Sequence, residues 1–491
     1  MSSKENEMNS IKDSNKVSIL IIILTIFILI GCEPNNETLI AERQDCDQGY
    51  HRDDEKCVEN IDICADKSKN CSCKETLTSF ECRCNFGYTG NGNLAECYDY
   101  HTVFQYGGSD KDIATSLAID LNDNVYLVGE ESTNLEEFSF PLFFEVQNNK
   151  MVNIYYDFFG EDSSFKASSL AVDKTHNNAL YFVGREENQS KIIKRELGKI
   201  KWSRKFSANE APLFVNTNSL NKPLVIGNNN THSFIQEYQT EKQEKEIEEE
   251  YLYWNEVIKN EKSELLENFF PVSVDFDKDN NIYVVGNRYE NNINTIIIMK
   301  YRNNFTEIDG ELNREVLYYE TIDDATLYAT SMAIDQKENI YITGAKKVNE
   351  NNSTAFLIQK NINTKKEATV YFDTPSSNAT AVKVVTKNND IYVLGYTDGE
   401  YEGNKSRGNI DLFLTKFYSN FDFTSNNNEE KYWHRQIGTE LNDIAKDIKI
   451  DSKNNIWILG ETEGVFNNAI YDTGGDYNRG ETDIFLMKIE Q

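Results

Sequence analysis

Nine cysteines are the residues whose types and spacing suggest specific chemistry. Cys32 stands alone, and the others lie between positions 46 and 97. Such clustering in an exported chain indicates a disulfide framework. The pairs Cys71-x-Cys73 and Cys82-x-Cys84 would also suit a four-thiolate zinc site. We favour disulfides, because thiols become paired in an oxidising compartment.

Export is indicated by the first segment of the chain. Residues 17–30 form a predominantly apolar run that follows Lys12 and Lys16. The run is shorter than the roughly 20 residues that span a bilayer, and it fits the apolar region of a signal peptide. A short signal-anchor with an incidental cysteine is the alternative interpretation.

The sequence Leu29-Ile30-Gly31-Cys32 resembles the lipobox of bacterial lipoproteins. The resemblance implies that residues 1–31 are a signal peptide, that the thiol of Cys32 is lipidated, and that residues 32–44 form a tether. Several acyl chains anchor a protein firmly, at about 0.8 kcal/mol per buried CH₂. We therefore expect an extracytoplasmic, membrane-anchored lipoprotein of a bacterial envelope or cell surface. The sequence leaves the membrane and its leaflet open.

Residues 45–99 form a cysteine-rich module with the spacing Cys64-x6-Cys71-x-Cys73-x8-Cys82-x-Cys84-x12-Cys97. Together with Phe86-Gly87-Tyr88 and Gly90, this spacing resembles an EGF-like domain. The resemblance implies the disulfides Cys64–Cys73, Cys71–Cys82 and Cys84–Cys97. Upstream, Cys46-x10-Cys57 looks like a truncated repeat closed by a Cys46–Cys57 disulfide. Each bridge is worth about 2–4 kcal/mol, which compensates for the small core of such a module.

Calcium is the one cofactor that this module suggests. EGF-like domains that bind calcium carry acidic or amide residues just before the first cysteine and after the third. Asn60, Asp62 and Glu75 are the candidate ligands, but Ile63 replaces one ligand and Glu75 stands where Asp or Asn is usual. Calcium prefers six to eight oxygen ligands, so the substitution weakens the predicted site.

One pattern recurs seven times from residue 101 onward: an apolar strand that ends in Asp, a short Asn-rich turn, and a strand of the form aromatic-x-x-Gly. The β-branched and aromatic content of these segments, with Asn and Asp between them, predicts adjacent antiparallel strands. Third and fourth strands follow, among them TIIIMKY, VLYYETI and, in the third repeat, YLYW at 251–254. The second strands end at Gly129, Gly184, Gly227, Gly286, Gly344, Gly395 and Gly460.

Repeated four-stranded antiparallel sheets are typical of propeller blades. The repeat resembles the SBBP-type propeller repeat, which implies an all-β, seven-bladed β-propeller over residues 100–491. The chain ends after a third strand, DIFLMKIE, whereas TVFQYGG near residue 102 matches the fourth-strand segment WHRQIG. We therefore expect the N-terminal strand to complete the last blade and to remove two exposed edges.

Composition and motifs argue against nucleic-acid binding and against several classes of enzyme. The net charge of −31 repels phosphate backbones and argues against nucleic-acid binding. The five histidines show no metal-binding spacing, and the chain contains neither a G-x-S-x-G motif nor a phosphate loop. The sequence thus gives no catalytic residues, and we expect a protein that is not an enzyme.

The segment Asp275-x-Asp277-x-Asp279-Asn280 has the spacing of a calcium loop. It lies at the predicted turn between the first and second strands, where Asp and Asn commonly bond to nearby backbone. We favour a structural turn.

Two long loops in neighbouring blades, residues 396–410 and 461–482, are the candidate ligand face. Aromatic rings beside acidic side chains suit a glycan or a protein epitope. We hypothesise a surface protein that binds such a partner; a polysaccharide lyase or hydrolase, or an envelope scaffold, is the alternative. The candidate contact residues are Tyr396, Asp398, Tyr401, Phe466, Tyr471, Asp472, Asp476 and Tyr477.

Overall fold

The computed structural model describes most of residues 102–490 and six short strands before them. In the main part the description omits residues 108–109, 133–138, 156–163, 174–178, 230, 243–247, 260–261, 263, 292, 309–310, 373–376, 402–403, 405, 420, 423–431, 467–468 and 472–480. The chain divides into two compact units, residues 1–99 and residues 100–491. The described residues contain no helix that is long and apolar enough to cross a membrane.

The first unit contains three two-stranded antiparallel sheets. The register places Cys71 opposite Cys84 and Cys73 opposite Cys82. The disulfide pairing itself stays a prediction, and Cys32, Cys46 and Cys64, like Asn60 and Asp62, lie outside the described residues. The strands are β1 (Tyr50–Asp53), β2 (Lys56–Glu59), β3 (Cys71–Glu75), β4 (Phe80–Cys84), β5 (Tyr88–Gly90) and β6 (Cys97–Asp99).

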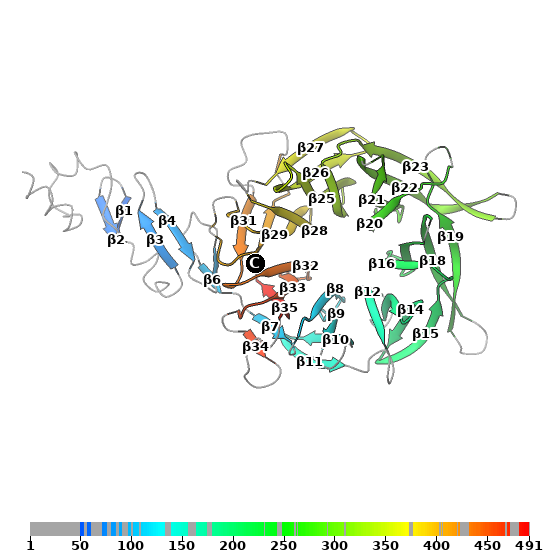
Figure 1. Ribbon diagram of the computed structural model, residues 1–491, viewed down its shortest axis with the longest axis horizontal. Helices are drawn as coiled ribbons and strands as arrows, with labels where there is room; N and C mark the ends of the chain where they lie inside the picture. Colours follow the sequence, from blue (N-terminus) through cyan, green and yellow to red (C-terminus); the bar gives the residue numbers. More distant parts are fainter. Residues whose placement is uncertain are drawn as a thin grey trace, which may run out of the picture. The chain divides into compact units, whose positions relative to one another are not determined.

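The second unit is a ring of seven antiparallel blades, which confirms the predicted propeller (Figure 1). Blades 1 to 4 contain β8 (Ile113–Ile119), β9 (Val125–Ser132), β10 (Ser139–Gln147), β11 (Lys150–Tyr155); β12 (Phe165–Val172), β13 (Leu180–Glu186), β14 (Gln189–Glu196), β15 (Lys199–Lys205); β16 (Ala211–Thr217), β17 (Pro223–Asn228), β18 (Ser233–Lys242), β19 (Glu248–Val257); and β20 (Phe269–Phe276), β21 (Ile282–Glu290), β22 (Ile293–Ile308), β23 (Glu311–Ile322). Blades 5 to 7 contain β24 (Leu327–Ile334), β25 (Asn339–Lys347), β26 (Ser353–Asn361), β27 (Lys366–Tyr371); β28 (Ala379–Lys387), β29 (Asp390–Thr397), β30 (Asp411–Phe417), β31 (Tyr432–Ile437); and β32 (Asp443–Ile450), β33 (Ile456–Thr462), β35 (Asp483–Ile489) with β7 (Thr102–Tyr106) and β34 (Ala469–Tyr471).

The N-terminal strand β7 closes the ring as predicted. It pairs antiparallel with β35, so that Gln105 lies opposite Phe485. All five side chains of β7 are buried. The structure adds an element that the sequence pattern did not indicate, because β34 pairs in parallel with the other edge of β7. The last blade therefore has five strands.

The apolar core lies mainly between neighbouring blades. One cluster packs Phe104, Trp457 and Leu459 of blade 7 against Leu127 and Phe144 of blade 1. Because each blade covers the face of the next, the strands alternate between two buried faces. This explains why the third strands β30 and β35 are buried along their whole length.

The Asp residues that end the first strands form turns, as we favoured over calcium binding. In blade 4, Asp277 Oδ1 accepts hydrogen bonds from the N–H groups of Asp279 and Asn281 at 3.0 and 2.9 Å. The side chain of Lys300 lies 2.9 Å from Asp277 Oδ2. Asp275 instead accepts a hydrogen bond from Ile334 N–H in the next blade. The described residues contain no cluster of His, Cys, Asp or Glu suited to a metal ion.

Candidate functional site

The innermost strand of each blade contains a β-bulge at the same position, and the residue that follows it lines the central channel in every blade but the fifth, where Ser331 is fully buried. The register shifts immediately before this residue in every blade. We call the seven residues the channel ring: Ser116, Ser169, Phe214, Ser273, Ser331, Lys383 and Asp447.

Polar side chains of the channel ring join neighbouring blades at several positions around the ring. Leu170 N–H donates to Ser116 Oγ and Val215 N–H donates to Ser169 Oγ, both at 3.2 Å. Asp447 repeats this contact where the ring closes, since Leu117 N–H donates to its Oδ2 at 3.0 Å.

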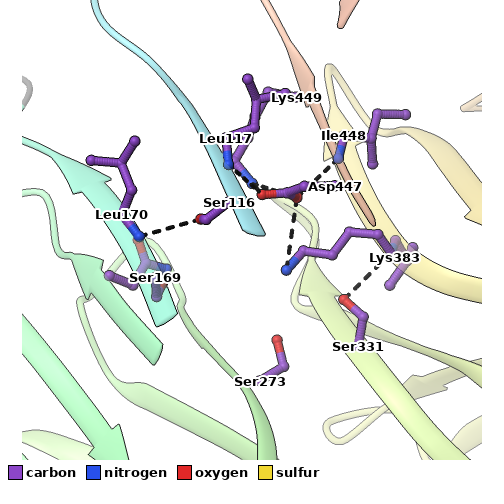
Figure 2. A network of polar contacts seen from close by, with 12 residues as sticks. Ser116, Leu117, Ser169, Leu170, Ser273, Ser331, Lys383, Asp447, Ile448 and Lys449 are labelled. Carbon is purple, nitrogen blue, oxygen red and sulfur yellow. Dashed lines mark hydrogen bonds and ion pairs between the residues drawn. The ribbon is translucent and has the colours of Figure 1, made fainter. Parts of the chain in front are cut away.

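Lys383 and Asp447 bring opposite charges together in the channel, and the serines surround them (Figure 2). Lys383 Nζ lies 3.8 Å from Asp447 Oδ1, whereas Lys449 Nζ lies 3.1 Å from the same oxygen. Burial alone would raise the pKa of Asp447, but the ammonium groups of Lys449 and Lys383 outweigh it and lower that pKa. Burial lowers the pKa of Lys383, against the attraction of Asp447.

The channel contains a cavity of about 380 Å³. Its lining combines serine and threonine hydroxyls with small apolar side chains and with Lys383, Lys387, Lys449 and Asp447. Pockets that bind small ligands typically have volumes of about 300–1,000 Å³. The channel is therefore large enough for a small polar molecule.

Two residues of the predicted ligand face are instead part of the core, which corrects the sequence interpretation. Tyr401 is 0% exposed and Phe466 is 2% exposed. Tyr401 stacks on Phe413 with ring centroids 4.2 Å apart, and Phe466 packs against Phe485 at 4.9 Å. Each ring fills an apolar space above a third strand, so neither side chain is available to a ligand on the surface.

The same buried contact fastens both loops to the ring, and we call it the glutamine clamp. In blade 6, Gln436 Nε2 donates to Gly399 O at 2.9 Å and to Asp411 Oδ2 at 2.8 Å. The N–H of Tyr401 donates to Gln436 Oε1 at 3.0 Å. The first segment of this loop is thereby fixed between two strands of its own blade.

Blade 7 repeats the glutamine clamp with a residue from the other end of the chain. Gln105 Nε2 donates to Gly464 O and to Asp483 Oδ2, both at 2.8 Å, and Phe466 N–H donates to Gln105 Oε1 at 3.2 Å. The sequence match between TVFQYGG and WHRQIG thus reflects a shared contact as well as a shared strand.

The other predicted contact residues have different positions. Tyr396 is half-buried at the end of β29, and Asp398 is exposed and accepts two hydrogen bonds from Asn378. Tyr471 belongs to β34, at the outer edge of blade 7. Asp472, Asp476 and Tyr477 lie outside the described residues, and Glu75 ends β3 in the first unit. Of the predicted contact residues whose side chains the structure describes, Tyr396 and Asp398 remain at the predicted face.

Two buried carboxylates flank Gly438 beneath these loops. A Cβ atom at Gly438 would lie 2.2 Å from Asp411 Oδ1 and 3.0 Å from Asp443 Oδ2, so glycine is required there. Burial raises the pKa of Asp443 to about 7, and Asp411 adds to the rise, whereas hydrogen bonds from Thr462 and Thr439 oppose it.

We expect Asp443→Asn to become progressively stabilising, relative to the native protein, between pH 4 and pH 7. The pKa of Asp443 is higher in the folded than in the unfolded chain, so its protonated form stabilises the fold at low pH and this contribution is lost as pH rises towards about 7. The slope is at most about 1.4 kcal/mol per pH unit. Urea unfolding of both proteins across this range measures the difference. A difference that does not change with pH would contradict the assignment.

No family model matches the chain, and no curated protein matches it either. Among solved structures, the chain is similar to polysaccharide lyase Uly1, with 9% identity and a TM-score of 0.46 over 79% of this chain and 92% of that chain. It is also similar to the β-propeller domain of the Trilobed protease from Pyrococcus furiosus, with 11% identity and a TM-score of 0.40 over 72% and 92% of the two chains. Drosophila Plexin A in complex with Semaphorin 1b gives 8% identity and a TM-score of 0.43 over 79% and 86%.

These similarities concern the fold alone. The chain is a seven-bladed β-propeller. Its sheets and their order establish this, and the fold is compatible with either a binding or an enzymatic role.

The channel ring was not predicted from the sequence. Its signal is a short motif, Ala-x-Ser, in the first strands of blades 1, 2 and 5. In each of them Leu or Met, then Ala, then Ile or Val, and then the terminal Asp follow the serine. Lys383 and Asp447 occupy the same motif position in blades 6 and 7. Comparing the repeats position by position would have shown that these two charges replace serine.

Proposed function

We propose that this chain is a lipid-anchored, extracytoplasmic surface protein whose propeller binds a protein or glycan partner through the loops of blades 6 and 7. The anchor follows from the lipobox resemblance at Cys32. The observation that carries the proposal is the glutamine clamp, which occurs in two neighbouring blades at the base of the two longest loops between second and third strands.

A clamp at the base of a loop favours binding because it reduces the entropy lost when a partner orders the loop. Tyr401 and Phe466 serve this purpose as buried anchors rather than as contacts. The segments that follow them, 402–410 and 467–482, supply the contact surface together with Tyr396 and Asp398. Long loops on a rigid scaffold commonly carry function.

The partner's chemistry is restricted by charge. A chain with a net charge of −31 favours neutral or basic partners and disfavours nucleic acids. Asp398 and the acidic residues of 472–480 suit hydrogen bonds to glycan hydroxyls or to basic side chains. Calcium at the module of residues 45–99, with Asn60, Asp62 and Glu75 as ligands, belongs to the same proposal.

We expect soluble residues 33–491 to bind a ligand on a glycan array, and shortening both loops to abolish that binding. The variant replaces 402–409 and 472–480 by short Gly-Ser linkers and keeps Tyr401, Phe466 and Asp411, so that both clamps remain. Its thermal midpoint should stay within a few degrees of the native value, about the effect of 1 kcal/mol. The array is measured with and without calcium.

A matched control shortens the corresponding loop of blade 5, residues 348–352, and should leave binding intact. Binding that survives in the double-loop variant would contradict the proposed face. Release of sugar products from a bound glycan would instead favour the enzymatic alternative. Binding lost only through changes on outer strands would favour the scaffold alternative.

A further inference from the structure

Two serines of the channel ring offer hydrogen-bond donors to the channel. Ser116 and Ser169 line the cavity, and each uses its hydroxyl oxygen to accept an N–H of the next blade at 3.2 Å. A hydroxyl also has one proton to donate. Among the residues that the structure describes, no acceptor takes the proton of these two hydroxyls. They remain available to a molecule in the channel.

Lys383 adds a positive charge to the channel. The carboxylate nearest to it, Asp447, is already paired with Lys449. Asp447 accepts the N–H groups of Leu117 and Ile448 at 3.0 and 2.9 Å and is paired with Lys449. Lys383 Nζ is 3.8 Å from Asp447, which is beyond hydrogen-bond distance. Its side chain is 26% exposed and lines the cavity. Within the described part of the chain its ammonium group makes no hydrogen bond.

The cavity is locally cationic in a strongly acidic protein. Lys383, Lys387 and Lys449 line it together with Asp275 and Asp447, so the formal charges of its lining sum to one positive charge. The chain as a whole carries −31. The overall charge does not account for this local excess, whereas a ligand that brings its own negative charge would neutralise it.

We propose that the channel cavity binds a small hydroxylated carboxylate of the sugar-acid class. The carboxylate accepts a charge-assisted hydrogen bond from Lys383, and the sugar hydroxyls face polar lining residues such as Ser169, Asn216 and Thr386. A volume of about 380 Å³ limits the ligand to roughly one or two sugar rings. This site goes beyond the proposed loop face and does not depend on it.

Titration calorimetry and thermal unfolding of residues 33–491 in chloride-free buffer test the proposal, with glucuronate, glucose and sulfate as separate probes. We expect saturable binding of glucuronate, a higher melting temperature with it, and no comparable effect of glucose. Lys383→Met should weaken glucuronate binding about tenfold or more, because a charge-assisted hydrogen bond is lost. Lys337→Met, which changes an exposed lysine on blade 5, should bind normally.

A second measurement uses the native protein and therefore does not depend on the folding of a variant. Acetylation of lysines by an N-hydroxysuccinimide ester, followed by peptide mass spectrometry, should show glucuronate protecting Lys383 but not Lys337. Equal binding of glucose, or sulfate binding as tight as that of glucuronate, would overturn the sugar-acid assignment. Absence of glucuronate binding and of protection would overturn the site. Shortening the loops of blades 6 and 7 should leave this binding unchanged, so the two proposals fail independently.

Discussion

Removal of β7 should prevent the propeller from folding to a stable closed ring. A chain that begins at residue 108 lacks Val103, Phe104 and Tyr106, all of which are buried. Burial of three such side chains contributes roughly 6 kcal/mol, which is comparable with the whole stability of many domains. We expect aggregation or the loss of a cooperative thermal transition.

The loss extends beyond the apolar contacts of β7. Without Gln105, the carboxylate of Asp483 loses its 2.8 Å hydrogen bond, and Phe466 loses the acceptor of its N–H. The edges of both β35 and β34 become unpaired at the same time. Exposed edges of this kind promote association between chains.

The matched control is a chain that begins at residue 100, which lacks the first unit but keeps β7. It should unfold cooperatively in differential scanning calorimetry, and a peptide of residues 100–107 should partly restore the shorter chain. Equal melting temperatures for the chains that begin at 100 and at 108 would show that β7 does not close the ring.

Arg314→Met should lower the free energy of unfolding by about 3 kcal/mol, towards the low end of the 3–5 kcal/mol expected for a broken buried ion pair. Arg314 Nη2 lies 2.8 Å from Glu237 Oε2, and both side chains are 1% exposed. The pair joins β23 of blade 4 to β18 of blade 3. The substitution leaves the Glu237 carboxylate buried, with Lys222 Nζ 3.5 Å away as partial compensation.

Urea unfolding of a double-variant cycle measures this coupling. Arg314→Met together with Glu237→Gln should be more stable than Arg314→Met alone, because the isolated charge is removed. The control is Arg302→Met on the same hairpin. Arg302 and Glu315 form a pair with side chains 46% and 56% exposed, so its loss should cost less than about 1 kcal/mol. Similar losses at Arg314 and Arg302 would contradict the buried pair.

The sequence by itself determined the number of blades, the strand type and the closure of the ring. These features depend on local patterns: alternating apolar residues form strands, and Asp and Asn side chains bond to backbone two to four residues away, as in the turn of Asp277. The outer strand at YLYW was also predicted correctly and lies within β19. The match of TVFQYGG with WHRQIG predicted the pairing of β7 because both segments obey the same local pattern.

Only the tertiary structure decided which side chains meet in the channel and which loop residues are buried. A β-bulge changes the alternation of inward and outward side chains, so spacing along β28 and β32 does not show that Lys383 and Asp447 face one another. Tyr401 and Phe466 look like surface aromatics in their polar loops. Contacts with the third strands Asp411–Phe417 and Asp483–Ile489 bury them instead, because each ring packs closely against an aromatic side chain of its third strand.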